Sequence, residues 1–450
     1  MKVLICFFDI NDFGGILNNQ EALYKGLLEL GHSVENVFLY WKPSVKPGTS
    51  ERGIEESLFG GKLDYEVGWT RMPRFAYRGK ENIERWKEYA SKFDLIIWQI
   101  PVPPKTKESQ GNMDWLELYN VPVKQIVYVH DGNMLKSYPH IYSIVKHLTG
   151  AVGVHPCAYN SLARLPVKRA MALSPQMNIK ARIKAADAAK KKRDGWFSLQ
   201  TIKVWKHVDD VVRAVPHMGT YRKILAGKGL HYHYMTSLEK IKPEYIIQRG
   251  RDPDIDEKLI GERIWDTAIK YGMKHIGWVN NEQREAKLHR ACCLIDPSWA
   301  LSLARLGDHF NRVVIDGIIG GAAPIARNLG VATNDEGIGE LFKPDVNYLM
   351  IPYDATPKEF AQMVDEYVDP SFKKNRERMI AETRTHLLPH FDYLKTAQTF
   401  IDLAKGETMA GYYKKQLDVS AGTFHRKTAF AGKALVEEFF NDNPKKEGFF

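Results

Sequence analysis

The sequence of 450 residues lacks several features that would each define a class of protein. It contains no run of about 18 apolar residues, so we expect no helix that spans a membrane. Its opening segment, MKVLICFFDIND, turns acidic too soon for a signal peptide and predicts a buried strand. No fixed-period repeat is present. These absences favour a cytoplasmic protein without a repeat architecture.

Cysteine is scarce as well, with four residues in the whole chain. Their positions, Cys6, Cys157, Cys292 and Cys293, have no metal-ligand spacing. Cys6, Cys292 and Cys293 lie in apolar segments. We therefore expect buried free thiols in a reducing compartment.

Apolar and basic residues are plentiful. Hydrophobic residues make up 44% of the chain and aromatic residues 11%, which is ample for folded cores. At this length, two domains are the natural expectation. The net charge of +10 favours a polyanionic partner such as nucleic acid or anionic lipid, although many basic soluble proteins have neither.

Apolar strands alternate with helical segments along most of the chain. We predict a helix over 18–30 and N-terminal strands over 2–8, 33–39, 95–100, 125–129 and 150–154. A second alternating unit begins at Trp196, with strands over 221–226, 273–276, 294–295 and 323–326. This order predicts an α/β fold of two Rossmann-like domains that face each other across a cleft. Ligands bind beyond the carboxyl ends of such strands.

A basic segment separates the two alternating units. Residues 178–193, NIKARIKAADAAKKKR, predict a charged linker helix, and a nucleic-acid contact is the alternative. We place the first domain at 1–192 and the second at 193–385. The rest, 386–450, contains a helix over 396–404 and ends in a basic, aromatic tail.

His130 and Asp131 follow a strongly apolar strand in the segment IVYVHDGN. Titratable groups at a strand end are costly unless they are paired or functional. A pair that pins the loop is as good an interpretation as a catalytic role. In catalysis, such groups would remove or orient the proton of an attacking hydroxyl.

Gly14 and Gly15 lie between the first strand and the first helix, where backbone N–H groups without a nearby Cβ can approach a phosphate. An ordinary tight turn explains them about as well.

Asp316 lies eight residues before Pro324 on a predicted helix. Its carboxylate can accept both ribose hydroxyls of a nucleotide, as acidic residues do in dinucleotide folds, and a helix-cap or surface role is the alternative.

The segment from His275 to Pro324 resembles the C-terminal domain of retaining GT-B glycosyltransferases. It runs HIGWVNNEQREAKLHRACCLIDPSW and ends with Asp316, the pair Gly320-Gly321 and the strand start Ala323-Pro324. The resemblance implies that this segment, Gly321 included, holds the nucleoside diphosphate of a sugar donor. It also implies that the final helices cross back to the first domain. The chain matches the family's diphosphate lysine at Lys206 but lacks its earlier arginine, which Arg305 could replace.

The segments IVYVHDGNMLKS and GAVGVHPCAYNSL resemble the phage DNA base glycosyltransferases of the T-even α-glucosyl type. This resemblance implies transfer of a sugar from a UDP-sugar, glucose or a pentose such as arabinose, to a hydroxylated cytosine in phage DNA, with retention. The enzyme would then work in the host cytoplasm. By the same resemblance His130 and Asp131 lie at the acceptor and sugar end, and His155 shapes the donor pocket. Lys206 meets the diphosphate and Asp316 holds the ribose.

Chemistry on a DNA base requires the base to be flipped out, and so requires a positive surface. The candidate DNA-binding residues are Arg71, Arg74, Arg78, Lys190 and Lys191. No cofactor is required, and a divalent metal is possible but not indicated, because no DxD motif is evident at a strand end. The alternative is a GT-B transferase that acts on a cell-surface glycan or lipid-linked acceptor.

Overall fold

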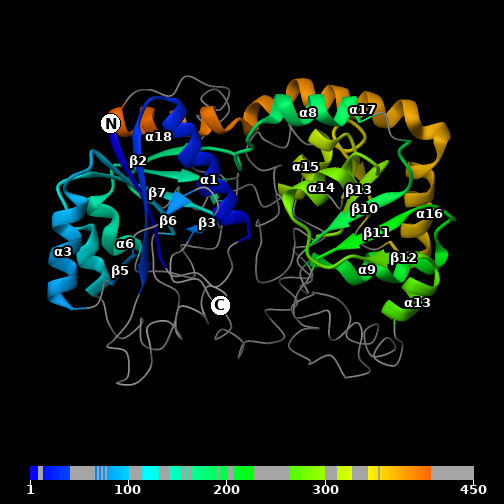
Figure 1. The fold of residues 1–450 in the computed structure, drawn as a ribbon, viewed down its shortest axis with the longest axis horizontal. Helices are drawn as coiled ribbons and strands as arrows, with labels where there is room; N and C mark the ends of the chain where they lie inside the picture. The colour runs from blue at the N-terminus through cyan, green and yellow to red at the C-terminus, as the bar shows by residue number, and fades with distance from the viewer. Residues whose placement is uncertain are drawn as a thin grey trace. The chain divides into compact units, whose positions relative to one another are not determined.

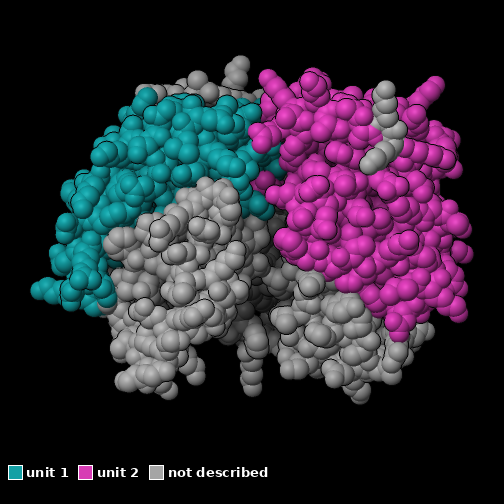
Figure 2. Space-filling view, viewed as in Figure 1, with its two compact units in different colours: residues 1–177, 390–418 teal, residues 178–389, 419–450 magenta. Residues whose placement is uncertain are grey.

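The computed structural model describes residues 1–8, 14–40, 66–67, 70–71, 74–76, 79–100, 114–130, 141–154, 158–159, 162, 165–189, 192–200, 206–227, 264–298, 312–326, 343–352 and 355–406. The chain divides into two units, coloured separately in Figure 2. Unit 1 takes Met1–Met177 with His390–Asp418, and unit 2 takes Asn178–Pro389 with Val419–Phe450. The sequence had placed the corresponding boundaries after residues 192 and 385.

Unit 1 contains a seven-stranded parallel sheet in the order β5-β2-β1-β6-β7-β8-β9. Its strands are β1 Lys2–Phe8, β2 Ser33–Tyr40, β5 Arg74–Ala76, β6 Leu95–Ile100, β7 Lys124–Val129, β8 Gly150–Gly153 and β9 Lys168–Met171. A separate antiparallel pair joins β3 Glu66–Val67 to β4 Thr70–Arg71. Among the described residues, its α-helices are α1 Gly14–Glu29, α3 Lys80–Ala90, α6 Ile141–Ile144 and α18 Tyr393–Lys405, and it also contains the 3-10 helices η1 Asp114–Tyr119 and η2 Val145–His147.

Both faces of this sheet are covered. In the β6–β7 register Trp98 lies beside Val127, so Tyr128 points to the opposite face. Trp98 stacks on Tyr119 of η1 with ring centroids 4.2 Å apart. On the other face Tyr128 meets Phe400 of α18 edge-on at 5.0 Å. The central strands are therefore fully buried, as their continuous apolar sequences predicted.

The C-terminal helix α18 returns to unit 1 and packs beside α1, where Figure 1 shows it in orange against blue. Gly26 of α1 makes this close approach possible. A Cβ there would lie 2.8 Å from the backbone oxygen of Tyr393 and 2.9 Å from Cβ of Ala397. The predicted crossing of the final helix to the first domain is confirmed.

Unit 2 contains a six-stranded parallel sheet in the order β12-β11-β10-β13-β14-β15. Its strands are β10 Trp196–Leu199, β11 Lys223–Ala226, β12 Met273–His275, β13 Cys293–Asp296, β14 Ala323–Ala326 and β15 Leu349–Met350. Among the described residues, its α-helices are α8 Ile179–Ala188, α9 Val208–Ala214, α13 Ile264–Lys270, α14 Asn281–Leu288, α15 Arg312–Gly320, α16 Pro357–Val368 and α17 Lys373–His386.

Successive residues of β10 enter two different cores. Trp196 packs in the cluster with α9, α13 and α16, whereas Phe197 packs with Leu288 of α14 and Val313 of α15. At its two ends β10 is held tightly against β11. A Cβ on Gly195 would overlap the carbonyl oxygen of Arg222, and a Cβ on Gly227 would overlap that of Gln200. Both glycines also have positive φ values, of 59° and 139°.

The α/β architecture predicted from the sequence is confirmed, and the predicted strands form within a few residues of their expected limits. The edge strands β5, β9 and β15 were not predicted, because each is only two to four residues long. Cys6, Cys292 and Cys293 are buried free thiols, as expected, and Cys157 lies outside the described residues. No helix in the described part of the chain combines the length and apolar character needed to span a bilayer.

The contact between α1 and α18 generates a stability prediction. Gly26→Val places a branched side chain against the backbone of Tyr393, so we expect unfolding free energy to fall by about 1–3 kcal/mol in urea denaturation. Lys25→Val is the matched control, because it places the same side chain at the preceding, half-buried position, whose side chain is 43% exposed. Equal losses in the two variants would contradict the proposed close packing.

Candidate functional site

The strand order of unit 2 changes direction between β10 and β13, and open α/β sheets bind ligands beyond the carboxyl ends of the strands at such a point. Gln200 follows β10, and Asp296 ends β13. Both are buried, and Gln200 Nε2 donates a hydrogen bond of 2.8 Å to Asp296 Oδ1. The backbone N–H of Ser298 donates to the same oxygen at 3.1 Å. Gln200 and the Ser298 backbone thus hold the carboxylate of Asp296 in one orientation.

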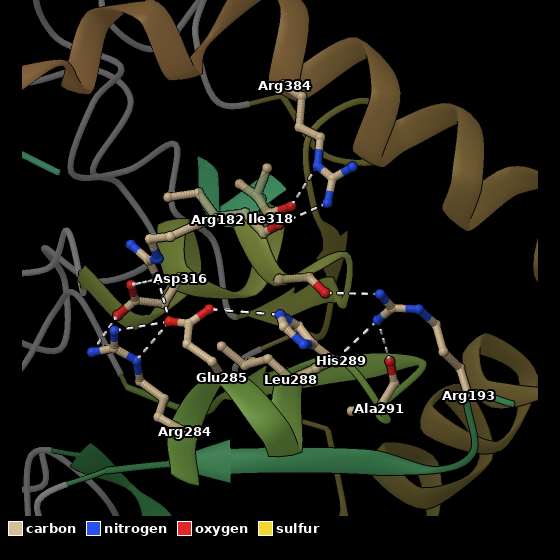
Figure 3. A network of polar contacts seen from close by, with 12 residues as sticks. Arg182, Arg193, Arg284, Glu285, Leu288, His289, Ala291, Asp316, Ile318 and Arg384 are labelled. Carbon is tan, nitrogen blue, oxygen red and sulfur yellow. Dashed lines mark hydrogen bonds and ion pairs between the residues drawn. The ribbon is translucent and has the colours of Figure 1, made fainter. Parts of the chain in front are cut away.

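Asp316 lies in the middle of α15 and is buried, with 3% of its surface exposed. Figure 3 shows how guanidinium groups from two other helices converge on it. Arg182 of α8 donates through Nη2 to Asp316 Oδ1 at 2.7 Å and to Glu285 Oε1 at 2.6 Å. Arg284 Nη2 donates to Glu285 Oε1 at 2.9 Å, and its Nη1 lies 3.6 Å from Asp316 Oδ2. Two carboxylates and two guanidinium groups thus form one network.

The charges around Asp316 decide its protonation. Burial alone would raise the pKa of this carboxyl, but Arg284, Arg182 and Arg312 outweigh it, and the net pKa is lowered. A carboxyl whose pKa is lower in the folded state stabilises the fold above its unfolded pKa. That stability is lost as the pH falls through the folded pKa. Asp316 is therefore ionised at neutral pH.

Two further arginines hold the C-terminal end of α15 (Figure 3). Arg193 Nη2 donates to the carbonyl of Gly320 at 2.8 Å, while its Nη1 donates to those of Leu288 and Ala291, both at 3.0 Å. Arg384 of α17 donates to the carbonyls of Ile318 at 2.9 Å and Ile319 at 2.7 Å. Positive charge at this end complements the helix dipole. Burial and the neighbouring Arg384 together lower the pKa of Arg193.

Gly321, predicted in the donor site, follows α15 directly and precedes β14. Its φ is 76°, and a Cβ there would overlap Nη2 of Arg193. This position is at the amino end of β14, away from the carboxyl ends of the strands. The end of α15 and the close approach of Arg193 are enough to explain why this residue is glycine, and no bound ligand is needed to explain it.

His130 follows β7 and takes part in a chain of hydrogen bonds that joins four polar side chains of unit 1. Ser174 Oγ donates to Asn19 Oδ1 at 2.8 Å, so the amide nitrogen of Asn19 faces His130 Nδ1, at 3.4 Å. On the other side, His130 Nε2 lies 2.7 Å from Gln99 Oε1. Both ring nitrogens of His130 therefore lie within hydrogen-bond distance of protein side chains, and these contacts orient the imidazole.

The described part of the structure includes some of the other predicted site residues. Lys206 is half-buried and lies two residues before α9 begins, after β10, and Gly14 and Gly15 are the first residues of α1. The backbone of Arg74 lies in β5, paired with Phe38 of β2, and Arg71 lies in β4. The predicted residues that lie outside the described residues are Arg78, Asp131, His155, Lys190, Lys191 and Arg305.

One cluster among the described residues has the spacing of a metal site. Ligand atoms of His207, Asp209 and Asp210 lie within 4.8 Å of one another at the start of α9. Asp209 also pairs with Arg213 at 3.3 Å, and His207 Nδ1 lies 3.6 Å from Asp210 Oδ2. A cation here would compete with the Arg213 guanidinium for Asp209. The sequence had indicated no metal and had assigned both aspartates to a helix.

Several solved structures share this fold. Anabaena HepE in complex with UDP matches with a TM-score of 0.57 and 11% identity, over 90% of this chain and 100% of that chain. An alpha-glucosyltransferase in complex with UDP-glucose and DNA containing an abasic site matches with a TM-score of 0.59 and 13% identity, over 90% and 99%. A mutant of S. aureus TarM in complex with Fondaparinux, alpha-GlcNAc-glycerol and UDP matches with a TM-score of 0.52 and 9% identity, over 90% and 100%.

No family model matches the chain, and no curated protein matches it in sequence. At these identities the likeness concerns the fold. The chain has the GT-B fold, and the predicted resemblance to GT-B glycosyltransferases, including one solved with DNA, is confirmed at that level.

The arginines at the end of α15 generate the next prediction. Arg193→Met leaves three backbone carbonyls without their guanidinium donor, so we expect a loss of about 3 kcal/mol in unfolding free energy. Arg378→Met, which removes an exposed arginine from α17, is the control and should stay within about 0.5 kcal/mol of the original protein. A similar stability of both variants in urea would exclude a stabilising role for Arg193.

Proposed function

We propose that this chain is a glycosyltransferase that uses a UDP-sugar as donor. The main support is its fold, which it shares over 90% of its length with proteins solved in complex with UDP or UDP-glucose. Unit 2 is compatible with such a donor, because the ionised carboxylate of Asp316 lies on α15, the helix between β13 and β14. A carboxylate can accept both ribose hydroxyls of a nucleoside.

For the acceptor we propose a hydroxylated cytosine in double-stranded DNA. The support comes from the sequence segments around His130 and from the alpha-glucosyltransferase complexes that contain DNA. The net charge of +10 favours a polyanionic acceptor. Arg71, Arg74, Arg78, Lys190 and Lys191 are the proposed DNA contacts. Glucose and a pentose such as arabinose are both candidates for the transferred sugar.

The proposed roles at the donor follow the charge that develops on the diphosphate as the sugar–phosphate bond breaks. Lys206 and Arg305 would stabilise this charge, and the backbone at Gly14 and Gly15 would donate N–H groups from the start of α1. His155 would shape the donor pocket. No metal is needed for these roles.

The proposed acceptor end consists of His130 and Asp131. With Nδ1 facing Asn19 and Nε2 facing Gln99, His130 is better suited to orient the sugar or the neighbouring loop than to remove a proton. Retention of configuration fits this arrangement, because attack on the same face as the leaving group makes a dedicated base optional. Asp131 would then orient the attacking hydroxyl.

A glycan or lipid-linked acceptor is the second candidate. Its specific support is the likeness to TarM in complex with alpha-GlcNAc-glycerol and to HepE in complex with UDP and glucose. The donor site would be the same in both cases, so only the acceptor distinguishes the two functions.

A UDP-release assay tests the proposed function. The purified protein would be mixed with UDP-glucose or UDP-arabinose, with and without duplex DNA that carries hydroxymethylated or hydroxylated cytosine. Digested nucleosides would then be weighed by mass spectrometry. We expect DNA-dependent UDP release and a sugar-sized mass gain on the base. Release that ignores DNA, without a modified nucleoside, would favour the glycan or lipid acceptor.

Asp316→Asn tests the donor site. The amide keeps the shape but loses the charge that strengthens hydrogen bonds to ribose, so we expect affinity for UDP to fall about tenfold or more in calorimetry. Asp187→Asn is the control, because Asp187 also pairs with an arginine of unit 2 but faces solvent. Unchanged UDP affinity in Asp316→Asn would show that Asp316 does not bind the ribose.

A further inference from the structure

Arg182 comes from a segment that the sequence assigned to a charged linker, yet its side chain is only 16% exposed. It lies on α8, which begins just after the point where the two units divide and belongs to unit 2. The side chain is positioned four residues before the buried Ala186, so both lie on the face of α8 that turns inward. From there it reaches both acidic side chains of the network (Figure 3).

The two oxygens of Asp316 have different surroundings. Oδ1 accepts the 2.7 Å hydrogen bond from Arg182. Within the described part of the chain Oδ2 accepts no hydrogen bond, and Arg284 Nη1 lies 3.6 Å from it. Arg182 thus fixes one oxygen of the carboxylate, and the other retains lone pairs for a further donor.

We propose that Arg182 is a positioning residue for the donor nucleoside, which anchors Oδ1 of Asp316 so that Oδ2 is presented to a ribose hydroxyl. This inference rests on the proposed function, since it requires a nucleoside diphosphate as ligand. Arg182 acts through Asp316, and the guanidinium itself binds no substrate. Charge-assisted hydrogen bonds of this length give the directional hold that a positioned acceptor needs.

The geometry also gives Arg182 an electrostatic effect. The charged groups that face Asp316 are Arg182 from α8, Arg284 and Glu285 from α14, and Arg312 from α15 itself. His289 lies 3.8 Å from Glu285 Oε2, and Arg384 of α17 is engaged with carbonyls at the far end of α15. Removing Arg182 deletes one of the charges that lower the pKa of Asp316, while its burial remains. The pKa of Asp316 should therefore rise.

The test compares UDP binding across pH in Arg182→Met and Arg182→Lys by calorimetry. An ionised Asp316 is needed to accept ribose hydroxyls, so binding weakens as the pH falls through its pKa. In Arg182→Met we expect the affinity for UDP to be about tenfold weaker at neutral pH. We also expect UDP binding to be lost at a higher pH, on acidification, than in the original protein. In Arg182→Lys the charge remains but the fork geometry is lost, so affinity falls while the pH dependence changes little.

Two controls separate positioning from general stability. Arg384→Met removes an equally buried arginine that contacts the same helix α15 but not Asp316, so it should lower stability without moving the pH dependence of binding. Lys184→Met replaces an exposed residue of α8 and should change neither. If Arg384→Met shifted the pH dependence of UDP binding as much as Arg182→Met does, the positioning role of Arg182 would be overturned.

The failure of this inference can be distinguished from the failure of the proposed function. If the original protein binds no UDP, the proposed function fails, and the role of Arg182 fails with it. If Asp316→Asn weakens binding but both Arg182 variants match the original protein in affinity and pH dependence, Arg182 is not a positioning residue, and the proposed function stands. Should Arg182→Met not fold, Arg182→Lys decides: undiminished affinity overturns the proposal, and weakened affinity with an unmoved pH dependence supports it.

Discussion

The burial of an ionised carboxylate inside α15 is the constraint that organises unit 2. A carboxylate removed from water is destabilising by several kcal/mol unless opposite charges and hydrogen bonds replace the solvent. Arg182 of α8 and Arg284 of α14 supply them, so both helices must dock at fixed positions against α15. Because Arg193 and Arg384 hold the other end of the same helix, α15 is fixed along its length. A helix held this firmly can present a ligand-binding group with little conformational freedom to lose on binding.

In unit 1 a line of hydrogen-bonded polar side chains fixes the orientation of a candidate site residue, a task that ion pairs perform in unit 2. The line from Ser174 through Asn19 and His130 to Gln99 joins residues after or within four separate elements, and each partner sets the orientation of the next. These contacts hold the imidazole of His130 in one orientation. The guanidinium groups of unit 2 are instead bonded to carboxylates and backbone carbonyls of their own unit.

The sequence predicted most of the fold but less of the site, for physical reasons. Buried central strands such as β1 and β6 carry continuous apolar runs, which local sequence alone reveals. The edge strand β9 begins with Lys168 and Arg169, and its strand character depends on pairing with β8. Arg182 was interpreted as part of a solvated basic run, although its spacing from Ala186 placed it on the inward face. Its two acidic partners lie more than a hundred positions away in the chain, and no local pattern reveals them.

Gly195, before β10, and Gly227, after β11, bear on how relatives of this chain could be found. Gly195 and Gly227 carry no functional group, yet any side chain at either position would displace the neighbouring strand's backbone. Substitution is therefore restricted by steric overlap whatever sugar or acceptor a descendant protein uses. We therefore expect both positions to remain glycine in distant relatives even where the binding residues differ. The two glycines thus offer fixed points from which distant sequences can be aligned.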